Sequence, residues 1–128
     1  MKNKINKVDI KDLEIKNVCF SLTDKNDKRE KKFKKQRIAR GFDDSETWSL
    51  RDTIANFILP RLKVFRESTC CYPGNLQNSE EWDAILLKIE RTFVLVVDDR
   101  TYLWTKKDIK DYNKGMKLFT EYFMDLWW

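Results

Sequence analysis

Cationic and aromatic side chains that could hold a phosphate group gather around one glycine of this chain. Arg37 and Arg40 end a lysine-rich run, Gly41 follows directly, and Trp48 comes after a short acidic stretch. Arginine makes bidentate contacts with phosphate oxygens, and aromatic faces stack on nucleobases. The stretch RGFDDSETWSL therefore predicts a site for a small nucleotide-type anion, although no standard phosphate loop is present. The predicted ligand-binding residues are Arg37, Arg40, Trp48, Arg51, Arg61 and Tyr72.

Four acidic residues in and just after this stretch could instead hold a divalent cation, because hard cations prefer several oxygen ligands. They are Asp43, Asp44, Glu46 and Asp52. Their spacing lacks the alternating ligands and distant glutamate of a calcium loop. Carboxylates near a helix start are stabilising in any protein, and Ser49 with Asp52 fits a capping box. Helix-start chemistry is the preferred interpretation, and no metal site is predicted.

Histidine is absent from all 128 residues. Its absence excludes the Ser-His-Asp and Cys-His arrangements for nucleophilic catalysis, and histidine-ligated metals. The pair Asp98-Asp99 is more typical of a solvated turn than of an acid/base pair. The sequence predicts a protein that is not an enzyme, with no catalytic residues and no cofactor. A hydrolase that uses Asp43, Asp44 or Glu46 with a metal is the least favoured of the functional hypotheses.

Three cysteines, Cys19, Cys70 and Cys71, do not match the spacing of zinc ligands, and a bridge between adjacent cysteines would be strained. The first residues, MKNKINKVD, contain no apolar signal region. The longest apolar run, FVLVV at 93–97, is too short to span a bilayer. A cytoplasmic location with reduced thiols and no membrane contact is expected.

The composition and periodicity favour helices. Hydrophobic residues make up 41 %, and there are only three glycines and two prolines. Apolar residues recur at helical spacing over 50–65, 82–93 and 109–126, with capping signals at Ser49, Asn78 and Thr105. Pro60 predicts a kink or a break in the first of these helices, and Gly115 weakens the last by about 1 kcal/mol. FVLVV fits either the end of a helix or a short strand.

These elements predict an all-α fold, a compact bundle of three to four helices in one domain, 1–128. Residues 1–23 are expected to form an N-terminal arm or short β-strands, residues 24–40 a basic helix, and residues 41–128 the helical core.

The segment 24–40 is strongly basic, with nine Lys or Arg against three acids. The net charge of the whole chain is +5, so the residues outside this segment have a net charge of −1. Such a run indicates a solvated helix, or a nucleic-acid-binding segment that acts through counterion release.

The C-terminus is rich in aromatic residues. Trp127 and Trp128 are adjacent, so both cannot point inward from one helix, and Phe123 lies one turn earlier. Aromatic residues are enriched at protein interfaces. Phe123, Trp127 and Trp128 are therefore predicted interface residues of a homo-oligomer, or of an inhibitor that binds a host protein.

Residues 36–128 resemble a family of small proteins encoded by tailed bacteriophages. The resemblance rests on RGFDDSETWSL, FILPRLK, YPG, EEWD and LWW in this order. It supplies no catalytic residues. The chain departs from the family pattern at Arg51, where the family has an acid, and at Cys71, where it has a glycine.

Such a resemblance implies a counter-defence factor in the cytoplasm of an infected bacterium. Combined with the cations and tryptophans, it leads to the first functional hypothesis: an oligomer that sequesters a nucleotide-type immune signal. Nucleic-acid binding through 24–40 and inhibition of a host protein are the alternatives.

Overall fold

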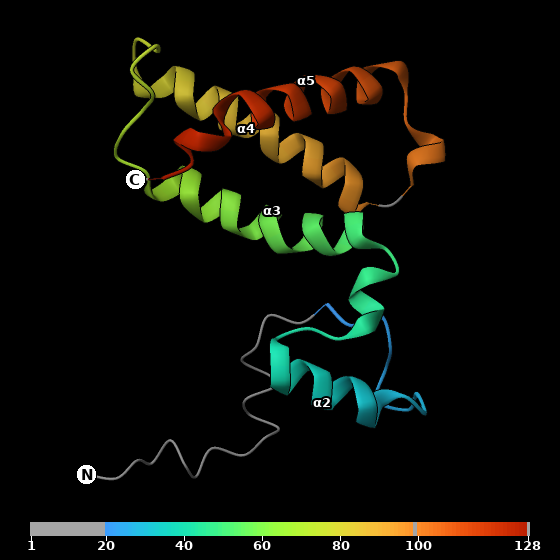
Figure 1. The fold of residues 1–128 in the computed structure, drawn as a ribbon. Coiled ribbons are helices and arrows are strands. Elements are labelled where there is room, and N and C mark those ends of the chain that lie inside the picture. Colours follow the sequence, from blue (N-terminus) through green and yellow to red (C-terminus); the bar gives the residue numbers. More distant parts are fainter. Residues whose placement is uncertain (1–19, 99, 128) are drawn as a thin grey trace, which may run out of the picture. The chain divides into compact units, whose positions relative to one another are not determined.

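The computed structural model describes residues 20–98 and 100–127, of which 71 % are helical. The four α-helices are α2 (Glu30–Arg40), α3 (Leu50–Ser68), α4 (Ser79–Val97) and α5 (Lys106–Tyr122) (Figure 1). Three short 3-10 helices are η2 (Asp44–Thr47), η3 (Thr101–Leu103) and η4 (Phe123–Asp125). The described part of the chain contains no strand, which confirms the predicted all-α class. Most of the predicted N-terminal arm, Cys19 included, lies outside the described residues.

Internal contacts divide the chain into two compact units, Met1–Thr53 (unit 1) and Ile54–Trp128 (unit 2). The boundary falls inside α3, so no loop or change of composition marks it in the sequence. The single domain expected from the sequence stays a prediction, and each unit is described by itself.

Unit 1 is built on α2, which starts later than predicted. The basic helix begins at Glu30 rather than at residue 24, because the Asp27 carboxylate accepts a hydrogen bond from the backbone amide of Arg29 at 2.8 Å and holds a turn there. The helix ends at Gly41, whose φ of 86° is a left-handed conformation that glycine adopts without strain. On the inner side of α2, Phe33 and Arg37 are both buried.

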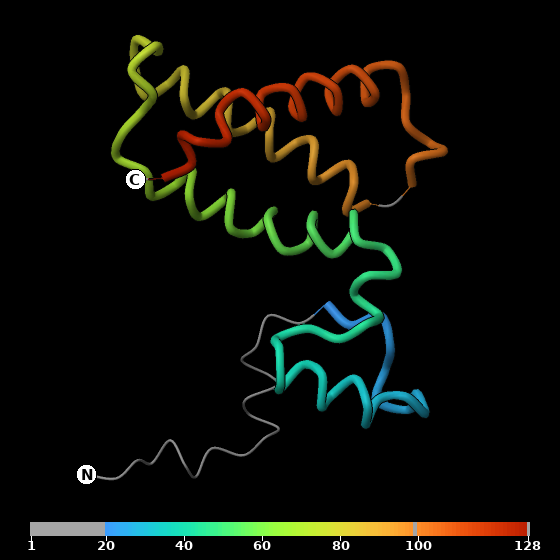
Figure 2. The backbone as a smooth tube through the Cα atoms, viewed as in Figure 1, coloured from blue at the N-terminus to red at the C-terminus, as the bar shows by residue number. Residues whose placement is uncertain are grey.

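Unit 2 contains α3 from Ile54 onward, α4 and α5, and these helices run alternately in opposite directions (Figures 1 and 2). Its core is apolar and draws on all three helices. The buried members are Ala55, Leu62, Trp82, Leu86, Ile89, Phe93, Leu118 and Tyr122. Trp82, the first residue of the apolar pattern over 82–93, is buried, and the apolar spacing predicted these helices correctly.

The structure decides two alternatives that the sequence left open in unit 2. Pro60 does not break the helix, because α3 continues through it to Ser68; the alternative prediction of a kink stays a prediction. Pro60 is exposed, so the position without an amide hydrogen lies on the solvent side of α3. Ala55 and Leu62, on the opposite side of the helix, are buried in the core. FVLVV is the end of α4, not a strand.

The capping predictions also agree with the helix starts. Asn78 caps α4 by accepting a hydrogen bond from the Glu81 amide at 2.9 Å, and Thr105 with Asp108 forms a capping box at α5. α3 starts at Leu50, directly after Ser49 as predicted, but the Ser49 hydroxyl donates to the Asp52 carboxylate instead of accepting from a backbone amide, so the capping box predicted there is not shown.

Gly115 lies where α4 and α5 approach most closely. A Cβ at this position would lie 1.8 Å from Thr92 Oγ1 and 2.4 Å from the backbone oxygen of Lys88. The Thr92 hydroxyl reaches across to the backbone oxygen of Tyr112 at 3.1 Å. The low helix propensity of glycine is therefore offset by a tight contact between helices that only glycine allows.

Candidate functional site

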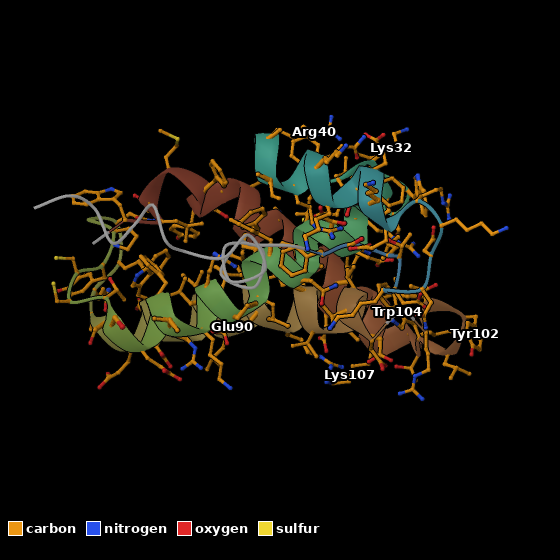
Figure 3. All side chains as sticks on the ribbon, turned by 90° about the horizontal axis from the view of Figure 1, so that it is seen from below. Lys32, Arg40, Glu90, Tyr102, Trp104 and Lys107 are labelled. Carbon is orange, nitrogen blue, oxygen red and sulfur yellow. The ribbon has the colours of Figure 1, made fainter. Side chains whose placement is uncertain are left out.

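The solvent side of α2 carries a face of lysines. Lys31, Lys32 and Lys35 are exposed, and their spacing of three and four residues places them on one side of the helix, while Lys28, also exposed, lies in the turn just before α2. Phe33 and Arg37 occupy the opposite side. Lys32 projects outward from α2, as does Arg40 near its end (Figure 3). We call Lys28, Lys31, Lys32 and Lys35 the lysine face.

An exposed tryptophan lies beside the start of the same helix. The guanidinium carbon of Arg29 lies 4.9 Å from the ring centroid of Trp48, and the Phe33 ring meets Trp48 edge-on at 5.9 Å. Trp48 is still 52 % exposed. A cation held over an aromatic ring is a stabilising pair that leaves ring surface accessible to a ligand.

A second cation–aromatic pair lies at the other end of α2. The guanidinium carbon of Arg40 lies 4.3 Å from the ring centroid of Phe42, and Arg40 Nη2 pairs with Asp44 Oδ1 at 2.5 Å. Gln36 fixes this loop, since its side chain donates to the Asp44 carboxylate and accepts from the Asp44 amide, both at 2.9 Å. The Arg40 hydrogen bond, with that of Gln36, lowers the pKa of Asp44 below its usual value.

Arg37 belongs to a buried ion cluster rather than to a ligand site. Its guanidinium Nη1 donates to Asp43 Oδ2 at 2.5 Å, and Nη2 pairs with the carboxylate of Glu30. Arg37 is 2 % exposed and Asp43 is fully buried. The predicted ligand contact at Arg37 therefore has its charge already neutralised inside unit 1.

Asp43 and Glu46 form a capping box at η2. The Asp43 carboxylate accepts from the Ser45 amide at 2.8 Å, and Glu46 accepts from the Asp43 amide at 2.7 Å. The other oxygen of Glu46 accepts from the Phe20 amide at 3.0 Å, which ties an earlier segment to the box. The preferred interpretation of these acids as helix-start chemistry matches their contacts.

Burial and hydrogen bonding act against each other at the Asp43 carboxylate. Burial raises its pKa, but hydrogen bonds from Ser45, Ser21 and Arg37 outweigh that effect and leave the pKa below the ordinary value of 3.8. Asp43 is therefore held as a carboxylate, which keeps the Arg37 pair intact.

Arg40 and Trp48 do not share a pocket. Trp48 packs at the start of α2 against Arg29 and Phe33, whereas Arg40 ends the helix, about 16 Å away along eleven helical residues. These two predicted ligand residues therefore do not contribute to one common site, and the cation over the tryptophan is Arg29. Arg51 lies 3.6 Å from Asp52 and is mostly exposed.

Arg61 and Tyr72 belong to unit 2, where they lie in different surroundings. Arg61 folds back on its own helix, with its guanidinium carbon 3.9 Å from the Phe57 ring centroid and a hydrogen bond to the Phe57 carbonyl at 2.7 Å. Tyr72 lines a small depression with Pro73, Trp82 and Trp127.

The predicted interface residues that the structure describes are exposed. Phe123 packs edge-on against Phe119 at 5.5 Å yet remains exposed, and Trp127 is 71 % exposed. Met124 between them is more exposed still. Trp128 lies outside the described residues.

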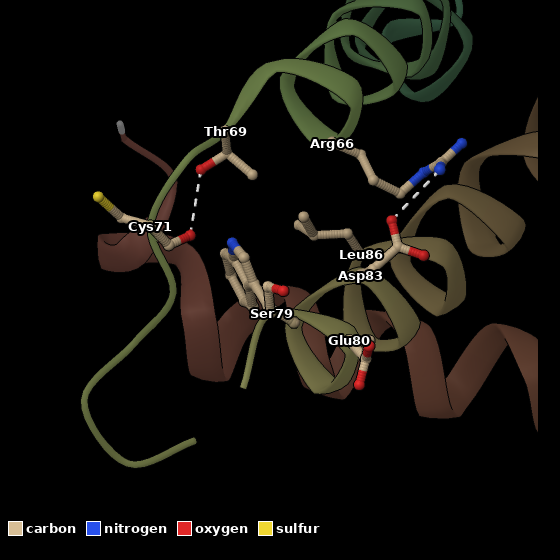
Figure 4. A pocket seen from close by; sticks show the side chains of 8 residues that line it. Arg66, Thr69, Cys71, Ser79, Glu80, Asp83 and Leu86 are labelled. Carbon is tan, nitrogen blue, oxygen red and sulfur yellow. Dashed lines mark hydrogen bonds and ion pairs between the residues drawn. The ribbon is translucent and has the colours of Figure 1, made fainter. Parts of the chain in front are cut away.

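A cavity of about 310 Å³ lies between the end of α3 and the start of α4 (Figure 4). Arg66 at its edge pairs with Glu90 and, at 3.4 Å, with Asp83. The hydrogen bond to Glu90 raises the pKa of Arg66 above its usual value. Because two carboxylates already neutralise this guanidinium, the cavity is a poor site for an anion.

Cys70 and Cys71 are exposed, with their sulfur atoms 3.7 Å apart, and the hydrogen bond between the two thiols raises the pKa of Cys71. A thiol with a raised pKa is a weaker nucleophile at neutral pH.

Within residues 20–98 and 100–127, no three or more Cys, Asp or Glu side chains are grouped so that they could hold a metal ion. No helix in the same ranges is both long and apolar enough to cross a bilayer.

The lysine face and Arg29 were not among the residues predicted from the sequence. A signal for the lysine face was present, since the spacing of Lys28, Lys31, Lys32 and Lys35 is the helical pattern normally sought in apolar residues. The total charge of the basic run does not reveal this pattern. The approach of Arg29 to Trp48 had no local signal, because a turn of the chain brings them together.

No protein-family model, curated protein or solved structure matches this chain. The resemblance to a family of phage proteins therefore stays a prediction.

Proposed function

We propose that this protein is a non-enzymatic binder of nucleic acid, and that unit 1 makes the contact. The lysine face carries the proposal. Three exposed lysines on one side of α2, and Lys28 in the turn before it, present ammonium groups to a phosphate backbone, and binding there gains affinity from the release of counterions. The buried Arg37 pairs hold the inner side of the helix, so the lysines are backed by a fixed surface.

The exposed aromatic rings favour nucleic acid over an acidic protein or a lipid surface. Trp48 beside Arg29 and Phe42 beside Arg40 flank the two ends of α2. Both rings are close to half exposed, and bases stack on aromatic faces of this kind without regard to sequence. A single-stranded nucleic acid would use the lysines and the rings together.

Sequestration of a small nucleotide by the residues predicted from the sequence has weaker support. Arg37 is neutralised by Glu30 and Asp43, and Trp48 and Arg40 lie at opposite ends of α2. The phage origin and a counter-defence role rest on the sequence resemblance alone, and the expected cytoplasmic location rests on the N-terminal residues and the short apolar runs of the sequence. All three are compatible with nucleic-acid binding.

The first experiment measures the salt dependence of binding. A fluorescently labelled single-stranded oligonucleotide is titrated with the full chain over a series of salt concentrations. Replacing Lys28, Lys31, Lys32 and Lys35 by Gln should reduce the slope of log K against log salt by up to about 3, roughly 0.7 for each lysine that contacts a phosphate. The matched control replaces four exposed lysines of unit 2, Lys63, Lys106, Lys110 and Lys117.

The control variant loses the same charge from unit 2 and should keep most of the salt slope. Equal losses in the two variants would show that total charge, not the lysine face, attracts the oligonucleotide. An intact chain that binds no oligonucleotide at low salt would overturn the proposal.

The second experiment tests the ring of Trp48. Trp48→Leu keeps an apolar contact for Phe33 but removes the aromatic face, so affinity for the single strand should fall by about 1–3 kcal/mol with little change in salt slope. Unchanged affinity would exclude base stacking at this position.

A second candidate function is protein binding through the C-terminal aromatics. Phe123, Met124 and Trp127 are exposed over one short segment of unit 2, and aromatic residues and methionine are enriched at interfaces. The predicted homo-oligomer would use this surface. Light scattering after size exclusion should give a multiple of 15.5 kDa for the native chain and the monomer mass for Phe123→Ser/Trp127→Ser. A monomeric native chain would exclude the homo-oligomer, and the C-terminal aromatic surface could then bind only a different protein.

A further inference from the structure

A second cationic site lies in unit 2, in a groove between α4 and α5 with a volume of about 310 Å³. Leu87, Lys88 and Arg91 of α4 and Lys107, Asp111 and Lys114 of α5 line it. Lys107 projects from the first turn of α5 (Figure 3). The total charge outside 24–40 is close to zero, so a cluster of cations here was not expected from the sequence.

Two of the four cations in the groove are already paired with acids. Arg91 Nη2 bonds Asp108 Oδ1 at 2.8 Å and its Nε lies 3.6 Å from Asp111 Oδ2, while Lys107 Nζ lies 3.3 Å from the same Asp111 oxygen. Lys88 and Lys114 form no ion pair with any residue of the described ranges. The groove therefore has a net charge of about +2, which resides at Lys88 and Lys114.

The backbone that carries these two lysines is fixed by the crossing of α4 and α5. Gly115 follows Lys114, and its Cα lies against the backbone oxygen of Lys88 so closely that no Cβ would fit. The two side chains thus start from neighbouring points on different helices. Because the backbone is already fixed, less conformational entropy is lost when an anion binds between the two lysine side chains.

The groove also offers apolar surface. Leu87 is 45 % exposed, and the hydrocarbon stems of the lysines add further apolar wall below their charged ends. A bounded volume of this size suits a small ligand better than a polymer. The lysine face of α2, in contrast, lies on the outer side of a helix.

We propose that the α4–α5 groove binds a small phosphate ester, with the phosphate at Lys88 and Lys114 and the organic part against Leu87. This site is separate from the nucleic-acid contact proposed for unit 1 and does not depend on it.

The test is isothermal titration of the full chain with AMP, with inorganic phosphate and with adenosine. AMP should bind more tightly than either of the others, because it carries both the charge and an apolar body. Replacing both Lys88 and Lys114 by Gln should weaken AMP binding by about tenfold, since each exposed ion pair contributes up to roughly 1 kcal/mol. Leu87→Asn should weaken AMP binding but leave inorganic phosphate binding unchanged.

The matched control replaces Lys31 and Lys35 of α2 by Gln, which removes the same charge from unit 1. It should leave AMP binding unchanged and weaken oligonucleotide binding, so failures of the two proposals are distinguishable. Circular dichroism checks that each variant keeps its helices. The groove proposal is overturned if AMP does not bind, if both double variants weaken AMP equally, or if inorganic phosphate binds as tightly as AMP.

Discussion

Units 1 and 2 are both helical, but they are held together by different kinds of core. The buried residues described in unit 1 are Phe33, Arg37, Asp43, Ser45 and Glu46, so most of them are polar or charged. Unit 2 buries mainly large apolar side chains, Trp82, Leu86 and Ile89 among them. The first unit depends on charge pairs whose loss leaves a buried ion, and the second depends on shape and packing.

The same motif has a different role in each unit. Asp43 with Glu46, and Thr105 with Asp108, are both capping boxes. In unit 1 the box is buried and joined to Arg37, whereas in unit 2 it lies on the surface, where Asp108 also meets Arg91. A capping motif recognised in the sequence therefore predicts the local hydrogen bonds but not how much they contribute to the stability of the fold.

The largest effect is expected from Arg37→Met. This change leaves the buried Asp43 carboxylate without its cation, so unit 1 should lose about 3–5 kcal/mol of stability. Amide hydrogen exchange should show faster opening of α2, with α4 and α5 unchanged. Equal loss of protection in α4 would mean that the two units unfold together. Arg40→Gln is the control, because its pair with Asp44 is exposed and should contribute under about 1 kcal/mol.

Gly115→Ala should be the most damaging small change in unit 2. Helix propensity alone predicts a gain of about 1 kcal/mol for alanine, but the new Cβ would overlap Thr92 Oγ1 and the Lys88 carbonyl oxygen. A net loss of about 1–3 kcal/mol is expected from urea unfolding. Gly74→Ala, which would meet no atom within 4 Å, should change little. A stabilised Gly115→Ala would contradict the close contact of the two helices.

Thr105→Ala tests the exposed capping box. Loss of the hydrogen bond from the Asp108 amide to the Thr105 hydroxyl, 3.1 Å long, should cost about 1 kcal/mol. Thermal unfolding followed by circular dichroism measures it, and Thr105→Ser, which keeps the hydroxyl, should restore most of the stability. A cost as large as that of Arg37→Met would remove the distinction between the two units.

The smallest effect expected is that of mild acid on unit 1. The pKa of Asp43 is lowered in the folded chain, so its contribution is complete above the ordinary value of 3.8 and is lost as the pH falls below it. At about pH 3.5 only part of that contribution is lost, because the folded pKa lies lower still. Hydrogen exchange should show α2 weakening before the core of α4, and Asp43→Asn should remove this pH dependence. Simultaneous weakening of both helices would argue against the Asp43 cluster.

Local patterns in the sequence determined the helices and most of their ends. The three- and four-residue spacing of apolar side chains gave the faces of α3, α4 and α5, and Asn78 and Thr105 marked two starts. These predictions succeeded because capping and amphipathic periodicity involve residues within a few positions of one another. The basic run also predicted α2, except that its first turn begins at Glu30.

Only the tertiary structure decided which charges are available to a ligand. Arg37 and Lys35 are equivalent in a count of charge, yet Arg37 is buried against Asp43 and Lys35 is exposed. The pairing of Trp48 with Arg29, and the gathering of Lys88 and Lys114 in one groove, join residues that are distant in sequence. Packing of separate segments sets these contacts, so sequence spacing determined the helices while tertiary packing determined the candidate sites.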